Sequence, residues 1–362
     1  MKKWSKERIW DWYKRENWLR GCNFMGSDCA NRIDQWQELG FKERLKTADR
    51  ELKLAASTGF NAVRLILEYI IWKEDHDGFM ERLDQYLDMA YQYGIRVMLV
   101  FGNDCMLPYK DPNSHLHSGV QHFDIGYHGG RKNSQHSSLN KEPGYSLLDE
   151  PELANDIYKW VAEIIDKYKT DPRVVIWDLY NEPGNAKREE LTKPHLKKFF
   201  EIAREINPMQ PITSGVWRIN SNLDQTLCEV EQFVLDESDI ISYHNYGNYI
   251  ENVEIISKLK KLGRPIICTE WLGRVKHNTV QEMFPLFFVE KIGCFNWGFV
   301  AGKYQTYEPW EGTWESYYRG EPNDYDFTKW FHDLYRINGR PYDPKEIDII
   351  KRLSREADLL KI

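Results

Sequence analysis

Eight short apolar runs, separated by longer amphipathic segments, constrain the fold of this chain more than any other feature. Alternation of this kind is typical of repeated βα units and a parallel sheet. The strand-like runs are residues 21–25, 61–67, 95–101, 174–180, 211–217, 240–246, 265–271 and 294–300. Eight strands with intervening helices predict a (β/α)8 TIM barrel, an α/β fold whose functional site forms at the C-terminal ends of the strands.

The segments between these runs have the apolar spacing of helices. Gly59, Gly94 and Gly263 follow three of them, where a C-terminal cap is expected. The predicted helices are residues 45–58, 79–93, 151–169, 193–206, 252–262 and 279–291, with a closing helix at 341–362. Without an internal repeat, a low-complexity tract or a linker, residues 1–362 are predicted to form a single catalytic barrel domain.

Two connections are too long to be simple turns. Residues 103–150 follow the third strand and are rich in Gly, Pro, Ser, Asn and His, while residues 303–326 follow the eighth strand and are rich in aromatic residues. Loops of this size are usually functional or disordered. Both are expected to overhang the same barrel mouth.

Composition excludes several classes of partner. A net charge of -7 and a sequence pI near 5.9 give no electrostatic footprint for nucleic acid or an anionic membrane, and no apolar run approaches the length of a membrane span. Aromatic residues make up 14% of the chain, which suits sugar stacking as well as core packing. The six scattered cysteines and the polar N-terminal segment favour a cytoplasmic protein.

The fourth and seventh runs each end in a glutamate. The fourth passes directly into Asn181, Glu182 and Pro183, and the seventh contains Glu270 near its end. A single glutamate at a strand end is most often a surface charge, but a pair at these two barrel positions meets at one mouth. Two carboxyl groups roughly 5 Å apart are what a retaining glycosidase needs. We therefore predict Glu182 as general acid/base and Glu270 as nucleophile.

Arg64 interrupts the apolar second strand, and a buried guanidinium needs a partner. Beside Glu270 it would lower the pKa of that carboxyl group and keep it ionised, whereas Glu182 in a drier site would hold its proton.

Three further side chains are predicted around the glutamates. Alternation in the sixth strand points His244 and Tyr246 to one side, next to Glu270, and Trp297 ends the eighth strand as a floor for sugar stacking. A satisfied core histidine and a structural tryptophan are the alternatives.

These segments resemble the clan A glycoside hydrolases, and most closely the family 5 cellulase-like enzymes and bacterial 1,4-beta-xylanase-like hydrolases. The resemblance rests on residues 21–24, 177–183, 242–247, 268–270 and 296–303. It implies a barrel, a retaining mechanism and the same roles for Glu182 and Glu270. It also implies substrate-side roles for Arg64, Asn181, His244, Tyr246 and Trp297.

The chain departs from this family at the end of the third strand, where a histidine is common and Asn103 and Asp104 stand here. One of these two is expected to take over the contact to a sugar hydroxyl. With Trp217, Lys303 and Gln305 they are the candidate substrate contacts that would select the sugar, which the sequence leaves open.

Two other classes compete with a glycosidase. A metal-dependent barrel is suggested by five histidines in the third loop, but they show no compact ligand pattern, so no metal and no other cofactor is predicted. The five are His115, His117, His122, His128 and His136. A carbohydrate-binding barrel without activity would lack a carboxylate, and neither is missing. The long loops favour an exo-acting enzyme on short β-linked oligosaccharides, with an endo-acting β-glycanase as the alternative.

Overall fold

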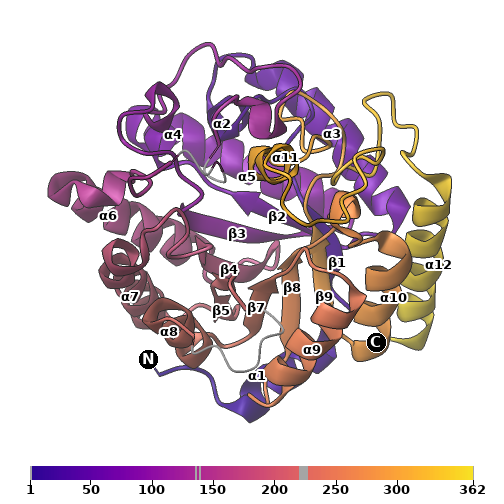
Figure 1. Ribbon diagram of the computed structural model, residues 1–362. Coiled ribbons are helices and arrows are strands. Elements are labelled where there is room, and N and C mark those ends of the chain that lie inside the picture. The colour runs from indigo at the N-terminus through magenta and orange to yellow at the C-terminus, as the bar shows by residue number, and fades with distance from the viewer. Residues whose placement is uncertain (1, 135–136, 138–139, 220–226, 362) are drawn as a thin grey trace.

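Parallel strands form one sheet that curls into a nearly closed barrel with helices around it (Figure 1). The computed structural model describes residues 2–134, 137, 140–219 and 227–361. The strands pair in the order β5-β4-β3-β2-β1-β9-β8-β7-β6. They are β1 (Arg20–Asn23), β2 (Ala62–Ile66), β3 (Arg96–Asn103), β4 (Val174–Asn181), β5 (Ile212–Thr213), β6 (Gly215–Val216), β7 (Ile241–His244), β8 (Ile266–Glu270) and β9 (Gly293–Asn296).

The fifth predicted strand is present as two short pieces at the two edges of the sheet. β5 pairs with β4 and β6 pairs with β7, and only Ser214 stands between the two pieces. The hydroxyl of Ser214 donates to the carbonyl of Tyr180 at 2.7 Å, which holds this break against β4. The predicted TIM-barrel fold is therefore confirmed. The eighth strand is shorter than predicted, because Gly298, with a φ of 74°, turns the chain out of the ladder after Asn296.

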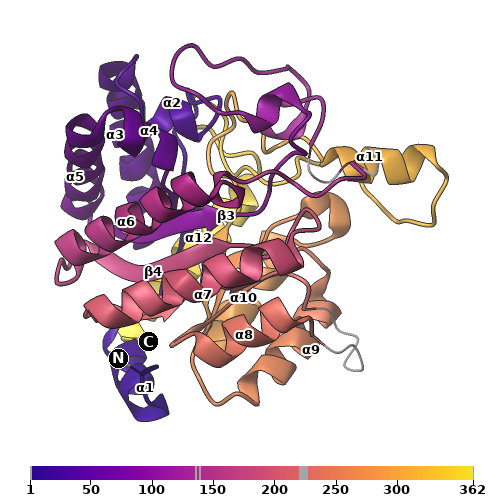
Figure 2. The same ribbon diagram turned by 90° about the vertical axis from the view of Figure 1, so that its left-hand side faces the viewer.

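Most helices pack around the outer surface of the barrel, while α1 and α11 lie at its two ends (Figures 1 and 2). The helices are α1 (Lys6–Arg15), α2 (Arg32–Trp36), α3 (Phe41–Thr58), α4 (Tyr69–Glu74), α5 (His76–Gln92), α6 (Pro151–Tyr168), α7 (Glu189–Ile206), α8 (Glu229–Glu237), α9 (Tyr249–Lys260), α10 (Val280–Glu290), α11 (Glu311–Tyr318) and α12 (Pro344–Leu360). The helices predicted from apolar spacing are present with shifted ends. Neither α2 nor α4 was predicted, because five or six residues are too few to show a helical period.

The helix ends follow their local chemistry. Gly59, Gly94 and Gly263, each expected to terminate a helix, have φ values of 104°, 73° and 68°, which favour glycine. The closing helix begins three residues later than predicted because Asp343 caps it, accepting a hydrogen bond from the backbone N–H of Lys345.

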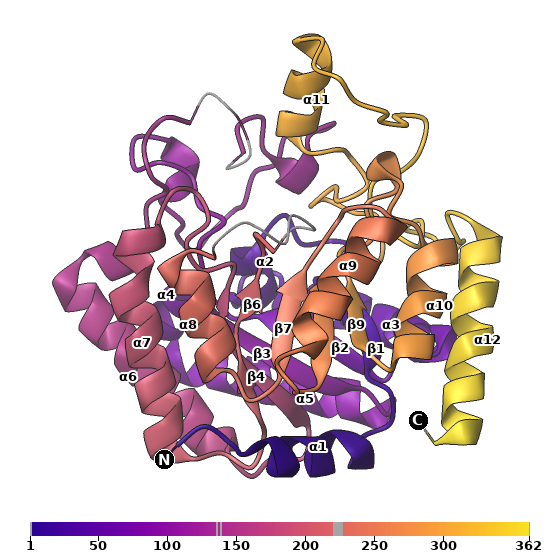
Figure 3. The same cartoon turned by 60° about the horizontal axis from the view of Figure 1, so that its bottom comes forward.

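Apolar side chains fill the barrel on both sides of its strands. Inside, Met98, Ile176 and Phe295 belong to one buried cluster, together with Ile9 and Trp12 of α1. Helix α1 thereby covers the N-terminal end of the barrel (Figure 3). No helix among the described residues is long and apolar enough to cross a membrane.

The opposite end of the barrel carries the long loops. The loop after β3 and the segment that contains α11 both rise above the C-terminal strand ends (Figure 3). Gln305 joins them, because its side-chain oxygen accepts a hydrogen bond from the N–H of Gly126 at 2.6 Å and its amide donates to the carbonyl of Asp124 at 2.6 Å. The barrel mouth is thus enclosed by loops that are bonded to each other.

Candidate active site

A fully buried guanidinium forms the base of the site. Arg64 of β2 donates to the carboxylates of Asp178 at 2.9 Å and Glu270 at 3.0 Å. It also donates to the side-chain oxygens of Asn23 and Asn181, each at 2.7 Å. The side chain has no exposed surface. The acceptors come from β1, β4 and β8, so one cation fixes the relative positions of three strand ends.

Glu270 lies at the end of β8 and is held at both oxygens. Arg64 donates to Oε1 and the hydroxyl of Tyr246 donates to Oε2 at 2.8 Å. Burial raises the pKa of Glu270, and nearby Glu182 raises it further, while His244, Arg64 and Tyr246 oppose the rise. Arg64 therefore lowers the pKa of Glu270 as expected, but desolvation at 5% exposure outweighs the cation and the net direction is upward.

Glu182 follows the last residue of β4 in a left-handed backbone conformation, with a φ of 48°. Such a conformation is costly for a residue other than glycine and persists where its surroundings enforce it. The backbone N–H of Gly184 donates to the buried carboxylate of Asp104 at 2.6 Å, which anchors the turn. The Glu182 carboxylate accepts from Asn185 at 2.5 Å and from the thiol of Cys105 at 3.0 Å.

His244 links the two carboxylates. Its Nδ1 lies 2.8 Å from Oε1 of Glu182 and 3.4 Å from Oε2 of Glu270. A carboxylate oxygen of each glutamate and a ring nitrogen of His244 all lie within 4.8 Å of one another. Gly215 leaves room for the ring, since a Cβ there would stand 2.7 Å from Nε2 of His244.

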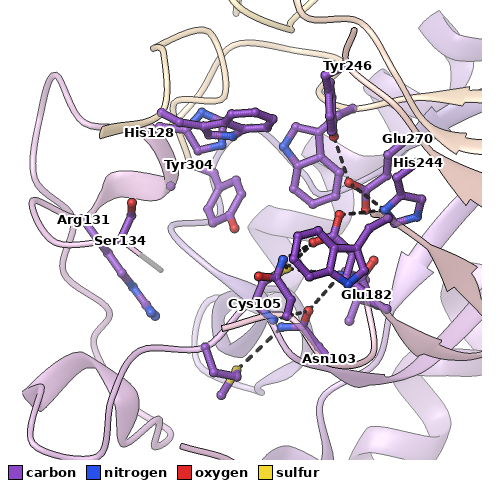
Figure 4. Close-up of a pocket in the computed structure, with 18 of the residues that line it drawn as sticks. Asn103, Cys105, His128, Arg131, Ser134, Glu182, His244, Tyr246, Glu270 and Tyr304 are labelled. Carbon is purple, nitrogen blue, oxygen red and sulfur yellow. Dashed lines mark hydrogen bonds and ion pairs between the residues drawn. The ribbon is translucent and has the colours of Figure 1, made fainter. Parts of the chain in front are cut away.

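The glutamates open into a pocket of about 540 Å³ (Figure 4). Of the predicted substrate contacts, those that line this pocket are Asn103, Asn181, Trp217, His244, Tyr246 and Trp297. Trp217 is fixed by a hydrogen bond from its Nε1 to the carbonyl of Pro183 at 3.2 Å. The ring of Tyr246 packs edge-on against Trp310, with the centroids 4.9 Å apart.

Four of the predicted substrate-side residues do not line the pocket: Arg64, Asp104, Lys303 and Gln305. Arg64 is fully buried against Glu270. Asp104 has no exposed surface and its oxygens accept from Tyr180, Gly184, Arg188 and Thr192. Its direction follows from alternation along the chain, which turns Asp104 away from the side that Asn103 faces.

Lys303 and Gln305 are the other two. Lys303 is exposed outside the pocket lining, and both polar atoms of the Gln305 side chain bond the backbone of neighbouring loops. Gln305 therefore shapes the mouth through the loops and does not face a sugar.

Four residues beside the glutamates were missed by reasoning from the sequence. Cys105 and Asn185 bond Glu182, while Asn23 and Asp178 bond Arg64. The alternation of β4 could have found Asp178, which lies two residues after the interior residue Ile176 on a strand buried along its whole length. The positions of Cys105 and Asn185 depend on loop conformation, for which the sequence has no comparable signal.

The loop histidines do not gather into a metal site in the described part of the chain. His115 bonds the carbonyl of Tyr109, His117 that of Ser118 and His128 that of Glu308, while His136 lies outside the described residues. The one group of three or more potential metal ligands among the described residues is Glu182, His244 and Glu270 itself.

A barrel whose fourth and seventh strands deliver two adjacent carboxylates into a sugar-sized pocket defines a glycoside hydrolase site. The family model described as Cellulase (glycosyl hydrolase family 5) matches residues 23–302. The chain therefore belongs to glycosyl hydrolase family 5, within clan A, and is a retaining O-glycosyl hydrolase that acts on β-linked sugars. Among curated proteins, none matches the chain.

Solved structures share the fold at low identity. A structure of GH5_18 from Streptomyces cattleya in complex with GlcNAc is 12% identical, with a TM-score of 0.59, and the match covers 94% of this chain and 80% of that one. An exo-beta-1,4-mannosidase from Opitutaceae bacterium strain TAV5 is 14% identical (TM-score 0.57; 94% and 60% covered). An endo-beta-1,4-mannanase from Thermotoga petrophila is 15% identical (TM-score 0.57; 96% and 78% covered).

Proposed function

We propose that this enzyme releases sugar units from the end of short β-linked oligosaccharides by double displacement, with Glu270 as nucleophile and Glu182 as general acid/base. The observation that carries the proposal of double displacement is the approach of the two carboxylates to within 4.8 Å. A separation of roughly 5 Å fits direct attack by one carboxylate, whereas inverting enzymes keep roughly 6.5–9.5 Å for a water molecule.

The contacts of each glutamate support its role. Glu270 accepts from Arg64 and Tyr246, two donors that hold one oxygen each and leave the carboxylate oriented for attack on the anomeric carbon. Glu182 protonates the leaving oxygen in the first step and removes a proton from water in the second. His244 lies between the two groups and orients both.

The enclosed mouth supports end-on cleavage. The pocket of about 540 Å³ is lined by residues from the loops after β3 and β9 as well as from the strand ends, which favours a closed site over an open groove. The related folds include one protein named as an exo-beta-1,4-mannosidase and one named as an endo-beta-1,4-mannanase, so β-mannosides belong in the first substrate panel. An endo-acting β-glycanase is the alternative.

The roles can be separated with aryl β-glycosides of different leaving groups. Glu270→Gln is expected to lose turnover with every leaving group. Glu182→Gln should lose about 10²- to 10⁴-fold with a poor leaving group. With a 2,4-dinitrophenyl glycoside, Glu182→Gln should still release a burst of 2,4-dinitrophenol, because the departure of this group needs no protonation. Glu38→Gln, at an exposed position outside the pocket lining, is the matched control. Undiminished turnover of Glu270→Gln would exclude it as the nucleophile.

Product analysis over time distinguishes the mode of cleavage. Exo action releases one small product from the first minutes on, with the remaining chain shortened by one step at a time. An early ladder of intermediate oligomers from a defined hexasaccharide would establish internal cutting in its place.

We also propose that the enzyme works in the cytoplasm. All six cysteines are free thiols, four of them buried, and this supports a reducing compartment. Fractionation of the source cells with an antibody to the protein tests this placement.

A further inference from the structure

The pocket wall that faces the catalytic glutamates carries hydrogen-bond donors without acceptors. Arg131 and Ser134 belong to the loop after β3 and Tyr304 to the segment after β9, and all three line the pocket (Figure 4). Within the described part of the chain, the structure gives the Arg131 guanidinium and the Tyr304 hydroxyl no hydrogen-bond partner. Ser134 is only 8% exposed, and its hydroxyl also has no hydrogen-bond partner among the described residues.

The charge of Arg131 is not balanced by a direct contact. Its cationic neighbour Arg32 pairs with Glu68 at 3.3 Å, and Asp111 accepts from Asn133 at 2.8 Å, so the nearest carboxylates are already engaged. Burial lowers the pKa of Arg131, and repulsion from Arg32 adds to this effect. A partly buried cation without a partner is costly, and a bound anion would remove that cost.

The loops hold these donors in place before any ligand arrives. Gly130, directly before Arg131, packs so closely that a Cβ there would lie 2.8 Å from Phe123 and 3.2 Å from the carbonyl of Lys303. The Gln305 bonds to Asp124 and Gly126 lie in the same contact between loops. Such a prearranged set of donors is typical of a binding site and less so of a mobile surface arginine.

Lys276, a further cation of the pocket, is satisfied differently. Lys276 lies 5.0 Å from the ring centroid of Trp310 and 5.9 Å from that of Tyr325, so its charge rests over two aromatic faces. Burial lowers the pKa of Lys276, and Glu251 opposes the change. Lys276 therefore offers a control of equal charge in the same pocket.

We propose that Arg131, Ser134 and Tyr304 bind an oxyanion carried by the substrate, so that the enzyme is selective for acidic glycosides. The chemistry is that of a carboxylate of a sugar acid or of a phosphate or sulfate ester on a sugar, since a guanidinium fork donates two parallel hydrogen bonds to either. The two hydroxyls supply further donors. Tyr304 is drawn between Arg131 and Glu270 in Figure 4, and both charged groups act on its hydroxyl. We therefore expect the anion on the glycoside whose bond is cut or on its neighbour. This inference rests on the proposed function only in naming a glycoside as the carrier.

Calorimetric titration with monosaccharides tests the binding without relying on catalysis. The probes are glucuronate, galacturonate, mannuronate, glucose 6-phosphate and glucose 6-sulfate, each compared with its neutral parent sugar. At least one acidic sugar is expected to bind about 10- to 100-fold more tightly than its parent, the range for hydrogen bonds to a charged group. The comparison of carboxylate, phosphate and sulfate probes identifies the source of the anion.

Arg131→Gln should lose this preference while Lys276→Gln keeps it, and Ser134→Ala and Tyr304→Phe should weaken it without abolishing it. Circular dichroism and thermal unfolding check that each variant is folded. The inference is overturned if no acidic probe binds more tightly than its parent, or if the preference survives in Arg131→Gln.

A parallel assay with neutral and acidic aryl β-glycosides separates this inference from the proposed function. Hydrolysis of neutral glycosides together with no anion preference overturns the oxyanion site alone. Binding of acidic sugars without hydrolysis of any glycoside overturns the proposed function alone.

Discussion

The hydroxyl of Tyr246 is expected to set the pH at which Glu270, the proposed nucleophile, becomes competent. It donates to Oε2 of Glu270 at 2.8 Å, and its own pKa is raised by burial, so it stays a neutral donor across the working range. Tyr246→Phe deletes only the oxygen. The ring keeps its contacts with Trp310 and His332, whose centroids lie 4.9 and 5.3 Å away.

The size of the effect follows from the kind of bond that is lost. A hydrogen bond to a charged group contributes about 1.5–3 kcal/mol in favour of the ionised form. One pKa unit corresponds to about 1.36 kcal/mol, so the acidic limb of the profile should move by about 1–2 units. The direction is upward, because the lost donor stabilised the carboxylate and burial already raises the pKa of Glu270.

The measurement is kcat/KM against pH with an aryl β-glycoside that the wild-type enzyme cleaves. This ratio reports the free enzyme, and the values it gives belong to the coupled pair Glu182 and Glu270 together. Tyr317→Phe, at a 52% exposed position on α11, is the control and should leave the profile unchanged. If the acidic limb of Tyr246→Phe coincides with that of the wild type, the hydrogen bond does not tune the nucleophile.

Three further changes have expected outcomes. Cys105→Ala removes a thiol donor from Glu182. The pKa of the basic limb in the kcat/KM profile should therefore rise by less than about one unit, whereas Cys105→Ser should retain the wild-type profile. Asp104→Asn should lower the free energy of unfolding, measured in urea, by about 3–5 kcal/mol. The substitution leaves the buried Arg188 with less charge compensation and loosens the turn that carries Glu182. An unchanged urea midpoint would contradict this expectation. Burial raises the pKa of Asp333 to about 7. Between about pH 4 and 7 the folded protein therefore holds a proton on this carboxyl group that the unfolded chain has released. The free energy of unfolding should fall as pH rises from about 4 to 7. Asp333→Asn should flatten that slope, measured as urea midpoints at pH 5 and 7, and an identical slope would show that another group is responsible.

The strand ends could be predicted from the sequence because a parallel barrel leaves them little freedom. Continuous apolar runs mark the strands, and pairing in register then brings every C-terminal end to one mouth. Glu182 and Glu270 lie 88 positions apart in the sequence, yet the fourth and seventh positions of the barrel place their oxygens within 4.8 Å. Arg64, His244 and Tyr246 were found for the same reason, since a polar side chain in or directly after a buried strand has few directions to point.

The loops could not be predicted in the same way. Asn103 and Asp104 are neighbours of similar chemistry, and only the direction of the chain after β3 decides that Asn103 faces the pocket and Asp104 faces α7. Gln305 was expected at a sugar but bonds backbone groups about 180 residues away in the sequence, at Asp124 and Gly126. No periodicity links two such loops, so contacts of this kind appear only in three dimensions.

This division between strands and loops separates the proposed catalytic pair from the residues proposed to select the substrate. The Arg64 network fixes the glutamates through contacts among strand ends, and none of the residues in it belongs to the loop after β9. Arg131 and Tyr304 belong to loops that touch each other but are not part of that network. A change at the wall that carries Arg131 can therefore alter which sugar is accepted while the chemistry at Glu182 and Glu270 continues. The same separation predicts that Arg131→Gln loses the preference for acidic sugars and keeps its fold. The titration of acidic sugars therefore reports on substrate choice and not on catalysis.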